Sequence, residues 1–223
     1  MFTTRNGVIR ARLRQALREE IPAATKSGEV AVDFGCGARP YSGMIRGLGY
    51  EMRAFDIDPV DAGVEPIGPD GKLPLPAGSC DLVLSSQVLE HVEVPAAYLE
   101  ESHRIMKPGG AFVLSTHGHW PYHPHPGDYW RWTKTGLVRI VESAGFEVRL
   151  VRGVLGLAAT SVQMLQDSAW KRLPRVVRPP VAALTQLTIA GLDLVENRAR
   201  SGRLDDAAVW IVVAEAVGKP ESL

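Results

Sequence analysis

Short apolar runs alternate with stretches of helical periodicity through the middle of this chain. The runs rich in β-branched and aliphatic residues, which predict strands, are 29–34, 52–55, 81–85, 111–115 and 146–152. The stretches that predict helices between these strands are 40–48, 99–106 and 135–144. Strands that alternate with helices favour an α/β fold, in which a mostly parallel sheet carries helices on both faces.

The two ends of the chain add further elements. Residues 6–20 space their apolar side chains as an amphipathic helix does, and the Pro- and Gly-rich residues 60–79 predict a loop with a short strand near 64–67. Residues 156–204 predict a helical insert before a last apolar strand at 207–216. We expect one domain, 1–223, made of an N-terminal helix (1–27), a core (28–155), the insert (156–204) and the last strand with its tail (205–223).

The overall composition is that of an ordinary globular protein. Hydrophobic residues make up 45% of the 223 residues and charged residues 22%. Lys and Arg (25) balance Asp and Glu (25), so we expect no nucleic-acid partner. Residues 1–20 lack the apolar stretch of a signal peptide, and no apolar run is long enough to span a membrane. Because the two cysteines have neither disulfide nor metal spacing, we expect a reducing, cytoplasmic location.

The most specific local pattern is the turn after the first strand. This strand ends in Asp33 and runs into Gly35, Cys36 and Gly37 ahead of a helix. Glycines let the backbone approach a ligand closely because they have no Cβ, and the Asp33 carboxylate can meet a cationic amino group. Asp56 closes the second strand 19 residues after Gly37, the spacing at which a carboxylate accepts hydrogen bonds from ribose hydroxyls.

This pattern and later ones follow the order typical of one enzyme family. Residues 33–37 (DFGCG), 54–58 (AFDID), 73–92 (LPLPAGSCDLVLSSQVLEHV) and 106–110 (MKPGG) resemble motifs of class I S-adenosylmethionine-dependent methyltransferases of the type 11-like group. The resemblance covers residues 28–153, and it makes 207–216 the antiparallel last strand. It implies a doubly wound, Rossmann-like sheet of seven strands, the cofactor S-adenosylmethionine and methyl transfer.

The resemblance also implies, position by position, which residues hold the cofactor. The loop Gly35, Cys36, Gly37 would pass under its methionine part, with Asp33 near the amino group. Asp56 would hold the ribose, and the other implied contacts are Ile57 on the adenine, Asp70 and Gly71 near the adenine amino group, and Ser86 and Gln87 at the end of strand 81–85.

One position departs from the family pattern. Many members have a third glycine where this chain has Arg39, which we expect either to shape substrate access or to lie on the surface. A nicotinamide-dependent oxidoreductase shares the turn and the ribose acid, but its fingerprint requires glycine three residues after Gly37, where Pro40 stands. An inactive S-adenosylmethionine-binding module would be expected to have a broken glycine or acidic motif, and both motifs are intact.

Imidazole and aromatic side chains are concentrated after the strand 111–115. Residues 115–133 (STHGHWPYHPHPGDYWRWT) hold four of the six histidines and follow the carboxyl end of a strand, the edge that faces the ligand crevice in open α/β sheets. A base that takes the proton of an alcohol assists its attack on a sulfonium methyl group, and His is the usual base at neutral pH. Aromatic rings pack on the apolar faces of sugars. We therefore expect a hydroxylated, sugar-like acceptor.

The candidate residues for this chemistry come from the same segment and the motif before it. His117 and His119 are the first candidates for the base, followed by His91 with Asp128 as its orienting acid. The candidates for acceptor binding are Trp120, Tyr122, His123, His125, Tyr129 and Trp130. Residues 128–133 also resemble methyltransferases of bacterial polysaccharides, including sugar O-methyltransferases of mycobacteria. The implied reaction is O-methylation of a sugar or oligosaccharide, with O- or N-methylation of a non-sugar small molecule as the alternative.

A divalent metal is the alternative to a histidine base. Some small-RNA methyltransferases bind magnesium through a Glu-x-x-Glu-His block and a later His, and this chain has Gln87 for the first Glu and Asp128 at the later position. Glu90, His91 and Asp128 would make a thin hard-metal site. Because Leu-Glu-His-Val is also common in metal-free members of the fold, we favour a reaction without a metal.

The insert 156–204 is longer than an ordinary connection between strands. One helical face predicts core packing or a dimer surface, and it consists of Val177, Val181, Leu184, Leu187, Leu192 and Val195. Polar Gln186, Asp193 and Glu196 interrupt it and argue against a membrane helix. We expect the insert either to cover the substrate mouth or to pair two chains as a homodimer. A basic cluster, Lys171, Arg172, Arg175 and Arg178, is typical of a solvated face, with an anionic partner as the alternative.

Overall fold

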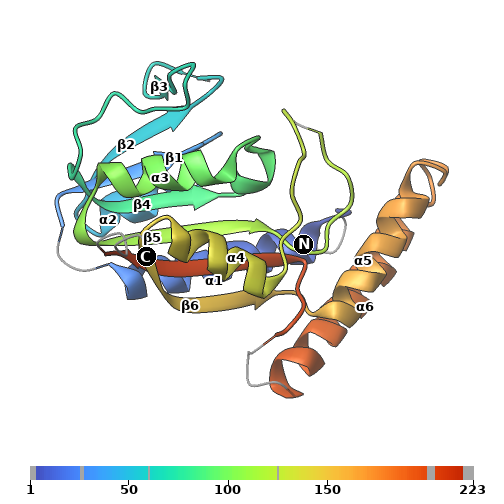
Figure 1. Cartoon of the computed structure of the whole chain (residues 1–223). Helices are drawn as coiled ribbons and strands as arrows, with labels where there is room; N and C mark the ends of the chain where they lie inside the picture. The colour runs from blue at the N-terminus through green and yellow to red at the C-terminus, as the bar shows by residue number, and fades with distance from the viewer. Residues whose placement is uncertain (1–3, 26–27, 60, 125, 200–203, 218–223) are drawn as a thin grey trace.

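The computed structural model describes residues 4–25, 28–59, 61–124, 126–199 and 204–217 (Figure 1). Within these residues, seven strands form one sheet in the order β3-β2-β1-β4-β5-β7-β6. The strands are β1 (Val30–Phe34), β2 (Glu51–Asp56), β3 (Glu65–Pro66), β4 (Cys80–Ser86), β5 (Met106–His117), β6 (Phe146–Val154) and β7 (Val209–Ala216). β7 pairs antiparallel with β5 and β6, and the other pairs are parallel. The predicted doubly wound, mostly parallel α/β sheet is confirmed.

The helices lie close to where the sequence predicts them. They are α1 (Gly7–Ala24), α2 (Ser42–Gly47), the 3₁₀ turn η1 (Leu89–His91), α3 (Pro95–Ile105), α4 (Lys134–Ser143), α5 (Leu157–Trp170) and α6 (Arg178–Ala199). α3 begins earlier than predicted because Pro95 occupies its first turn, where no backbone donor is needed. α4 begins after Thr133, whose hydroxyl accepts a hydrogen bond from the Gly136 amide at 3.2 Å.

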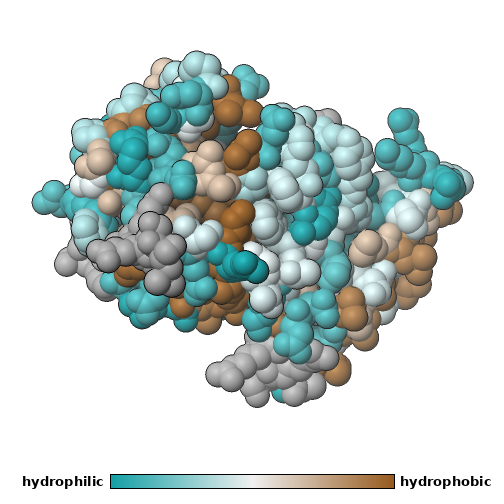
Figure 2. All heavy atoms as spheres, viewed as in Figure 1, coloured by the Kyte–Doolittle hydropathy of each residue, from teal (hydrophilic) through white to brown (hydrophobic). Residues whose placement is uncertain are grey.

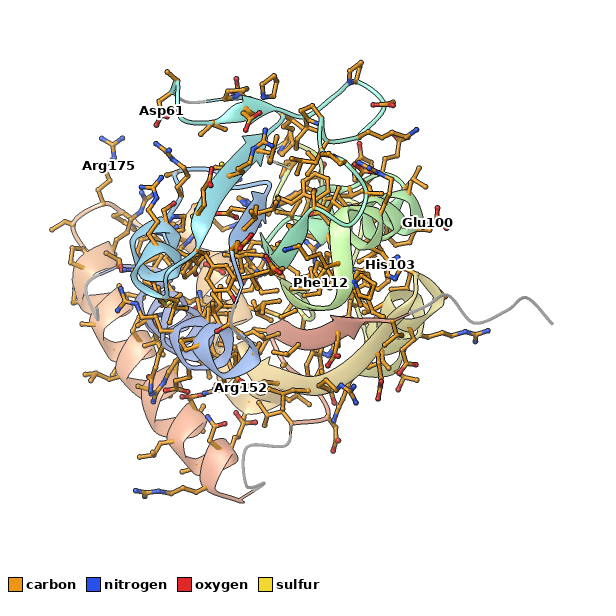
Figure 3. The ribbon with its side chains drawn as sticks, turned by 90° about the vertical axis from the view of Figure 1, so that its left-hand side faces the viewer. Asp61, Glu100, His103, Phe112, Arg152 and Arg175 are labelled. Carbon is orange, nitrogen blue, oxygen red and sulfur yellow. The ribbon has the colours of Figure 1, made fainter. Side chains whose placement is uncertain are left out.

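Alternate residues of the central strands point to opposite faces of the sheet and form two cores. Residues that pack with α3 and α4 include Val32, Phe34, Val83 and Phe112. Residues that pack with α1 and α2 include Ala31, Leu82, Leu84 and Val113. Figure 3 shows Phe112 among the side chains at the centre of the molecule, where its ring stacks on Phe146 with centroids 4.6 Å apart. Each such buried side chain contributes about 1.5–3 kcal/mol, so the two cores fix the edge of the sheet that carries the loops.

The strand β5 is longer than predicted. It includes residues 107–110, which the sequence predicts as a turn that ends a helix. The register shifts there, because Cys80 pairs with Met106 while Leu82 pairs with Ala111. The Lys-Pro-Gly-Gly stretch is therefore an irregularity within the strand, and the regular pairing that follows carries the chain to His117 at the carboxyl edge.

The insert forms a hairpin of α5 and α6 at one end of the sheet (Figure 1). Its inward side is polar, since the buried Gln163 and Gln186 hydrogen-bond to each other at 3.0 Å and both donate to the Arg5 carbonyl. Core packing is the wrong interpretation for much of the predicted apolar face, because Leu184 is 69% exposed and Leu187 is 56% exposed, although Leu192 packs against the core. No helix in the described part of the chain is long and apolar enough to cross a membrane.

Candidate active site

A cleft of about 2330 Å³ lies at the carboxyl ends of β1, β2, β4 and β5. The residues predicted to hold the cofactor all line this cleft, although they come from separate loops: Asp33, Gly35, Cys36, Gly37, Asp56, Ile57, Asp70, Gly71, Ser86 and Gln87. The parallel strands bring these loops together, because their carboxyl ends meet at one edge of the sheet.

The turn after β1 needs glycine for two different reasons. Gly35 has a φ of +80°, and a Cβ on it would lie 2.5 Å from a methyl group of Val88. Gly37 has a φ of +50°, but a Cβ there would meet no atom within 4 Å. The Gly35 amide donates to the Phe55 carbonyl at 2.8 Å, and the Gly37 amide donates to the Asp56 carboxylate at 2.8 Å. These bonds hold the turn against the end of β2.

Asp33 is a buried carboxylate at the floor of the cleft. It is 2% exposed, and its Oδ2 atom has no hydrogen-bond partner among the described residues. Burial, together with the negative charge of Asp56, raises the pKa of Asp33 to about 7, against an opposing effect of Arg39. Such a group gains from a cationic ligand, because a positive charge would offset both effects. The orphaned oxygen therefore fits the amino group of S-adenosylmethionine.

Asp56 and its neighbours form the next part of the wall. The Asp56 carboxylate is half-buried and accepts from the amides of Gly37 and Asp58, which leaves lone pairs for a ribose hydroxyl. Ile57 beside it is 64% exposed, so its side chain offers an apolar surface to a flat ring. Burial raises the pKa of the Cys36 thiol to about 12, so this residue contributes packing rather than a thiolate.

Arg39 has a left-handed backbone conformation, which glycine adopts more readily than other residues. Its φ is 52°, a left-handed conformation that costs a residue with a side chain roughly 1–2 kcal/mol. Its guanidinium forms an ion pair with Asp61 and donates to the Gly63 carbonyl at 3.2 Å. The described residues that line the cleft do not include Arg39. These contacts connect the loop after β2 to the glycine turn. The sequence predicted instead that Arg39 shapes substrate access or lies on the surface, and it did not indicate this connection.

The end of β4 is tied to β5 by short polar contacts. Ser86 and Ser115 have their hydroxyl oxygens 3.2 Å apart, and the Gln87 amide nitrogen lies 3.3 Å from the same Ser115 hydroxyl. Gln87 has a φ of 59°, which orients its backbone amide toward the Ser115 carbonyl at 2.8 Å. These contacts position Ser86, the last residue of β4, and Gln87 after it in the wall of the cleft.

Glu90 and His117 form a buried pair at the other end. Glu90 is fully buried, its Oε2 accepts from the Thr116 hydroxyl at 2.8 Å, and its Oε1 lies 3.4 Å from His117 Nδ1. Burial raises the pKa of the Glu90 carboxyl, and it lowers the pKa of the His117 imidazole to about 3 with help from the charge of Arg131. His117 is therefore neutral near pH 7, and it lines the cleft.

Two other imidazoles and an indole surround this pair. His91 and His123 have ring centroids 5.7 Å apart, and each lies 6.3 Å from the His117 centroid. Trp120 stacks on His117 at 5.1 Å, and all four side chains line the cleft. His91 Nδ1 donates to the Gly127 carbonyl, since a carbonyl oxygen can only accept. Tyr122 lines the rim and is 78% exposed.

Other candidates from the same segment lie outside the cleft. His119 is paired with Asp206 at 2.9 Å, and its side chain is about half exposed. The Asp128 carboxylate is held by Arg131 at 2.6 Å and by the His123 amide, and the hydrogen bond from Arg131 lowers the pKa of Asp128 to about 2. The Asp128 carboxylate therefore holds this loop together, whereas the sequence predicted that it orients His91. The indole of Trp130 donates to the Val92 carbonyl at 2.8 Å.

The remaining sequence candidates are placed as follows. Tyr129 is 54% exposed, and its backbone amide, rather than its ring, contacts the Glu90 carbonyl. His125 lies outside the described residues. The described part of the chain contains no group of three or more His, Cys, Asp or Glu residues arranged to hold a metal ion. Of the three residues considered as metal ligands, Glu90 and His91 lie near each other, but the third, Asp128, forms an ion pair with Arg131.

The sequence did not indicate the outer wall of the cleft. Ile9, Arg10 and Leu13 of α1 line it together with Ser168 and Lys171 at the end of α5. These residues come from opposite ends of the chain and meet only because α1 and the hairpin pack together at this end of the sheet. No local motif marks them. The Glu90–His117 pair, in contrast, joins two residues that the sequence marks separately, Glu90 as a candidate metal ligand and His117 as a candidate base. A carboxylate that orients the base could therefore have been proposed from the sequence.

The family of this chain follows from a match to a family model. Residues 7–151 match the model described as methyltransferase domain, which is more than half of the chain. The chain belongs to this methyltransferase family. The turn after β1 is therefore that of a methyltransferase and not that of a nicotinamide-dependent oxidoreductase.

Individual relatives agree with this assignment over part of their length. A probable S-adenosylmethionine-dependent methyltransferase of Mycolicibacterium smegmatis is 35% identical over 89 residues, which cover 37% of this chain and 35% of the relative. A ubiquinone biosynthesis O-methyltransferase of Caulobacter vibrioides is 28% identical over 113 residues, 44% of this chain and 45% of the relative. This chain thus matches less than half the length of either relative.

A solved structure shows the same fold over most of both chains. The S-adenosylmethionine-dependent methyltransferase of Mesorhizobium loti superposes with a TM-score of 0.56 and 20% identity, covering 90% of this chain and 97% of the other.

Proposed function

We propose that this chain is an S-adenosylmethionine-dependent methyltransferase that transfers a methyl group to a hydroxyl. The observation that carries this proposal is that one cleft joins Asp33, a buried carboxylate without a partner among the described residues, to His117, a buried neutral imidazole. The first suits a cationic cofactor, and the second suits the proton of a hydroxyl.

Binding of the cofactor would rest on residues of β1, β2 and β4. Asp33 would receive the amino group, Asp56 would accept hydrogen bonds from the ribose, and Ile57 would pack on the adenine. The positively charged sulfur of S-adenosylmethionine, when bound, supplies an activated methyl group. Gly35 and Gly37 would allow the backbone to lie against the ligand, because neither places a Cβ in the cleft.

His117 would act as the base. A proton on Nδ1 gives both this atom and Glu90 Oε1 a partner, and it leaves Nε2 free to accept. As the oxygen of the acceptor bonds to the methyl carbon and the carbon–sulfur bond breaks to leave S-adenosylhomocysteine, the proton of the acceptor would move to Nε2. His117 would then be cationic beside Glu90, and this ion pair offsets the burial that disfavours the charged imidazole. A base in this position contributes roughly 10²–10⁴-fold to the rate, and holding the reacting atoms in line contributes more.

The acceptor that we propose first is a hydroxyl of a sugar or oligosaccharide. Trp120 and Tyr122 present aromatic surfaces to the cleft, and histidines supply hydrogen bonds. A non-sugar small molecule is the second candidate, because the similarity to a ubiquinone biosynthesis O-methyltransferase favours it.

A methyl-transfer screen tests the proposal. Labelled S-adenosylmethionine is incubated with the protein and with oligosaccharides, small phenols or short RNA, and the label in each acceptor is counted. We expect label in a hydroxylated small acceptor, with sugars preferred. His119→Ala is the matched control for His117→Ala, because both remove an imidazole and only His117 lines the cleft. Preferential labelling of RNA, or no transfer to any hydroxyl, would contradict the proposal.

A further inference from the structure

The helix α6 buries two polar side chains next to the aliphatic Ile189, and it exposes most of its larger apolar side chains. Gln186 is fully buried and Asp193 is 2% exposed, and both are held by polar partners on α1. Leu184 and Val195, on the opposite side, are 69% and 63% exposed. The outward side of a surface helix in a globular protein is normally polar, so the outward face of α6 lacks the partner that its composition indicates.

This face is continuous along the helix. Its members recur at intervals of three or four residues, and we call them the outer face of α6: Pro180, Leu184, Leu187, Gly191, Leu194 and Val195. They carry no charge, and the stripe ends at Arg198. Figure 2 shows hydrophobic surface along the outer edge of the hairpin, with hydrophilic surface at its tip.

The tip between α5 and α6 is basic. Lys171, Arg172 and Arg175 are exposed, and none of the three forms an ion pair with a described residue. Figure 3 shows Arg175 pointing away from the body of the molecule. Arg178 has a different role, since it lies over the Trp170 ring at 5.7 Å and donates to the Leu173 carbonyl. Residues 168–192 contain no Asp or Glu, so this end of the hairpin has an uncompensated positive charge in a chain of net charge zero.

We propose that the hairpin docks on an anionic lipid bilayer, with the outer face of α6 in the interface and the basic tip on the headgroups. Exposed aliphatic side chains gain from an apolar phase, and adjacent unpaired cations gain from a negative surface. A second copy of this chain fits less well. An isologous dimer packs the same patch against itself, and residues 168–192 offer no acidic group to the cations.

Docking would place the mouth of the cleft beside the bilayer. Ser168 and Lys171 line the cleft, and Lys171 also belongs to the basic tip. An acceptor with a lipid anchor could then enter from the membrane surface. The docking itself does not depend on the proposed methyl transfer, because it is defined by the exposed surface of the hairpin alone.

Flotation of the full chain with vesicles tests this proposal. One vesicle is phosphatidylcholine alone, and the other contains about one third phosphatidylglycerol. The charge variant is Arg172→Gln with Arg175→Gln, and its control is Arg46→Gln with Arg139→Gln, which removes two exposed arginines from α2 and α4. The apolar variant is Leu184→Ser with Leu187→Ser, and its control is Leu48→Ser, at a leucine that is 39% exposed.

We expect binding to the anionic vesicles that weakens with salt, and little binding to neutral ones. The charge variant and the apolar variant should each bind roughly tenfold more weakly or worse, while both controls bind like the wild type. Failure to bind anionic vesicles, or equal loss in variants and controls, would overturn the proposal. Light scattering that shows a dimer abolished by Leu184→Ser with Leu187→Ser would also overturn it, since the outer face would then be a self-association surface.

Discussion

Oε1 of Glu90 lies 3.4 Å from Nδ1 of His117, and among the described residues neither atom has a hydrogen-bond partner of ordinary geometry. Both groups are buried, so each would be costly to leave unpaired. A proton on Nδ1 satisfies both atoms and leaves Nε2 without a proton.

Replacing His117 by Ala should lower kcat by roughly 10²–10⁴-fold, because it removes the proposed base. Affinity for S-adenosylhomocysteine should stay close to that of the wild type, since His117 lies away from the glycine turn. The measurement pairs steady-state kinetics with calorimetric titration. His119→Ala should leave kcat unchanged, as this imidazole pairs with Asp206 outside the cleft. Equal losses in the two variants would remove His117 from its role.

Glu90→Gln should lower kcat with KM unchanged, because Glu90 acts through His117 as a positioning residue. Its pH–rate profile should also change. Without a carboxylate beside it, His117 loses a group that favours the imidazolium, so the acid limb of the profile should move to lower pH. A merely structural role would lower activity without moving this limb, and that result would contradict the assignment.

The stability of the protein should fall in acid partly because of His117. Its pKa is lowered from 6.5 to about 3 by burial, so the unfolded chain takes up this proton before the folded one does. The contribution of His117 to the free energy of unfolding is therefore fully present above pH 6.5, and it is lost as the pH falls from 6.5 toward 3. Urea denaturation near pH 7.5 and near pH 5 measures how far the free energy of unfolding falls between these two conditions. This fall should be smaller in His117→Asn than in the wild type, by up to about 2 kcal/mol. An identical loss in both proteins would show that His117 does not titrate as described.

Binding of S-adenosylhomocysteine should release a proton from Asp33. In the free protein its pKa is about 7, and the ammonium group of the ligand should lower this pKa. Affinity should therefore rise as the pH increases toward 7 and then level off. Calorimetry in buffers of different ionisation enthalpy measures the proton directly. Asp33→Asn should bind without this pH dependence, and a wild type that releases no proton near pH 6 would place the amino group elsewhere.

The two glycines of the turn should differ in their tolerance of alanine. Gly35→Ala combines a positive φ with a Cβ 2.5 Å from Val88, so it should destabilise by about 3 kcal/mol or more and weaken cofactor binding. Gly37→Ala meets no atom within 4 Å and should cost only about 1–2 kcal/mol for the backbone. Urea midpoints of the two variants compare them, and equal midpoints would contradict the packing of Gly35 against Val88.

The sequence predicted the sheet well, and the residues that it assigned to the cofactor line one cleft, because both depend on local patterns. Runs of apolar residues mark each strand, and the turn after β1 needs its glycines where they stand. Arg39 is the exception, since a glycine conformation held by a distant Asp61 leaves no local signal.

The histidine end was harder to predict, since side-chain direction there depends on where β5 stops. His117 is the last residue of β5 and faces the buried Glu90, whereas His119 follows the strand and turns to Asp206. Residue type and spacing do not separate the two. The outward apolar face of α6 was also ambiguous, because periodicity identifies a face but not what covers it.

In the proposed function, the cleft binds S-adenosylmethionine through Asp33 and Asp56. Calorimetric titration of the wild type and of Asp56→Ala with S-adenosylhomocysteine tests this most directly. We expect saturable binding to the wild type and an affinity roughly ten- to a hundredfold lower in the variant, since a hydrogen bond to a charged group contributes about 1.5–3 kcal/mol. NAD should not bind. Tight binding of NAD with no binding of S-adenosylhomocysteine would contradict the account.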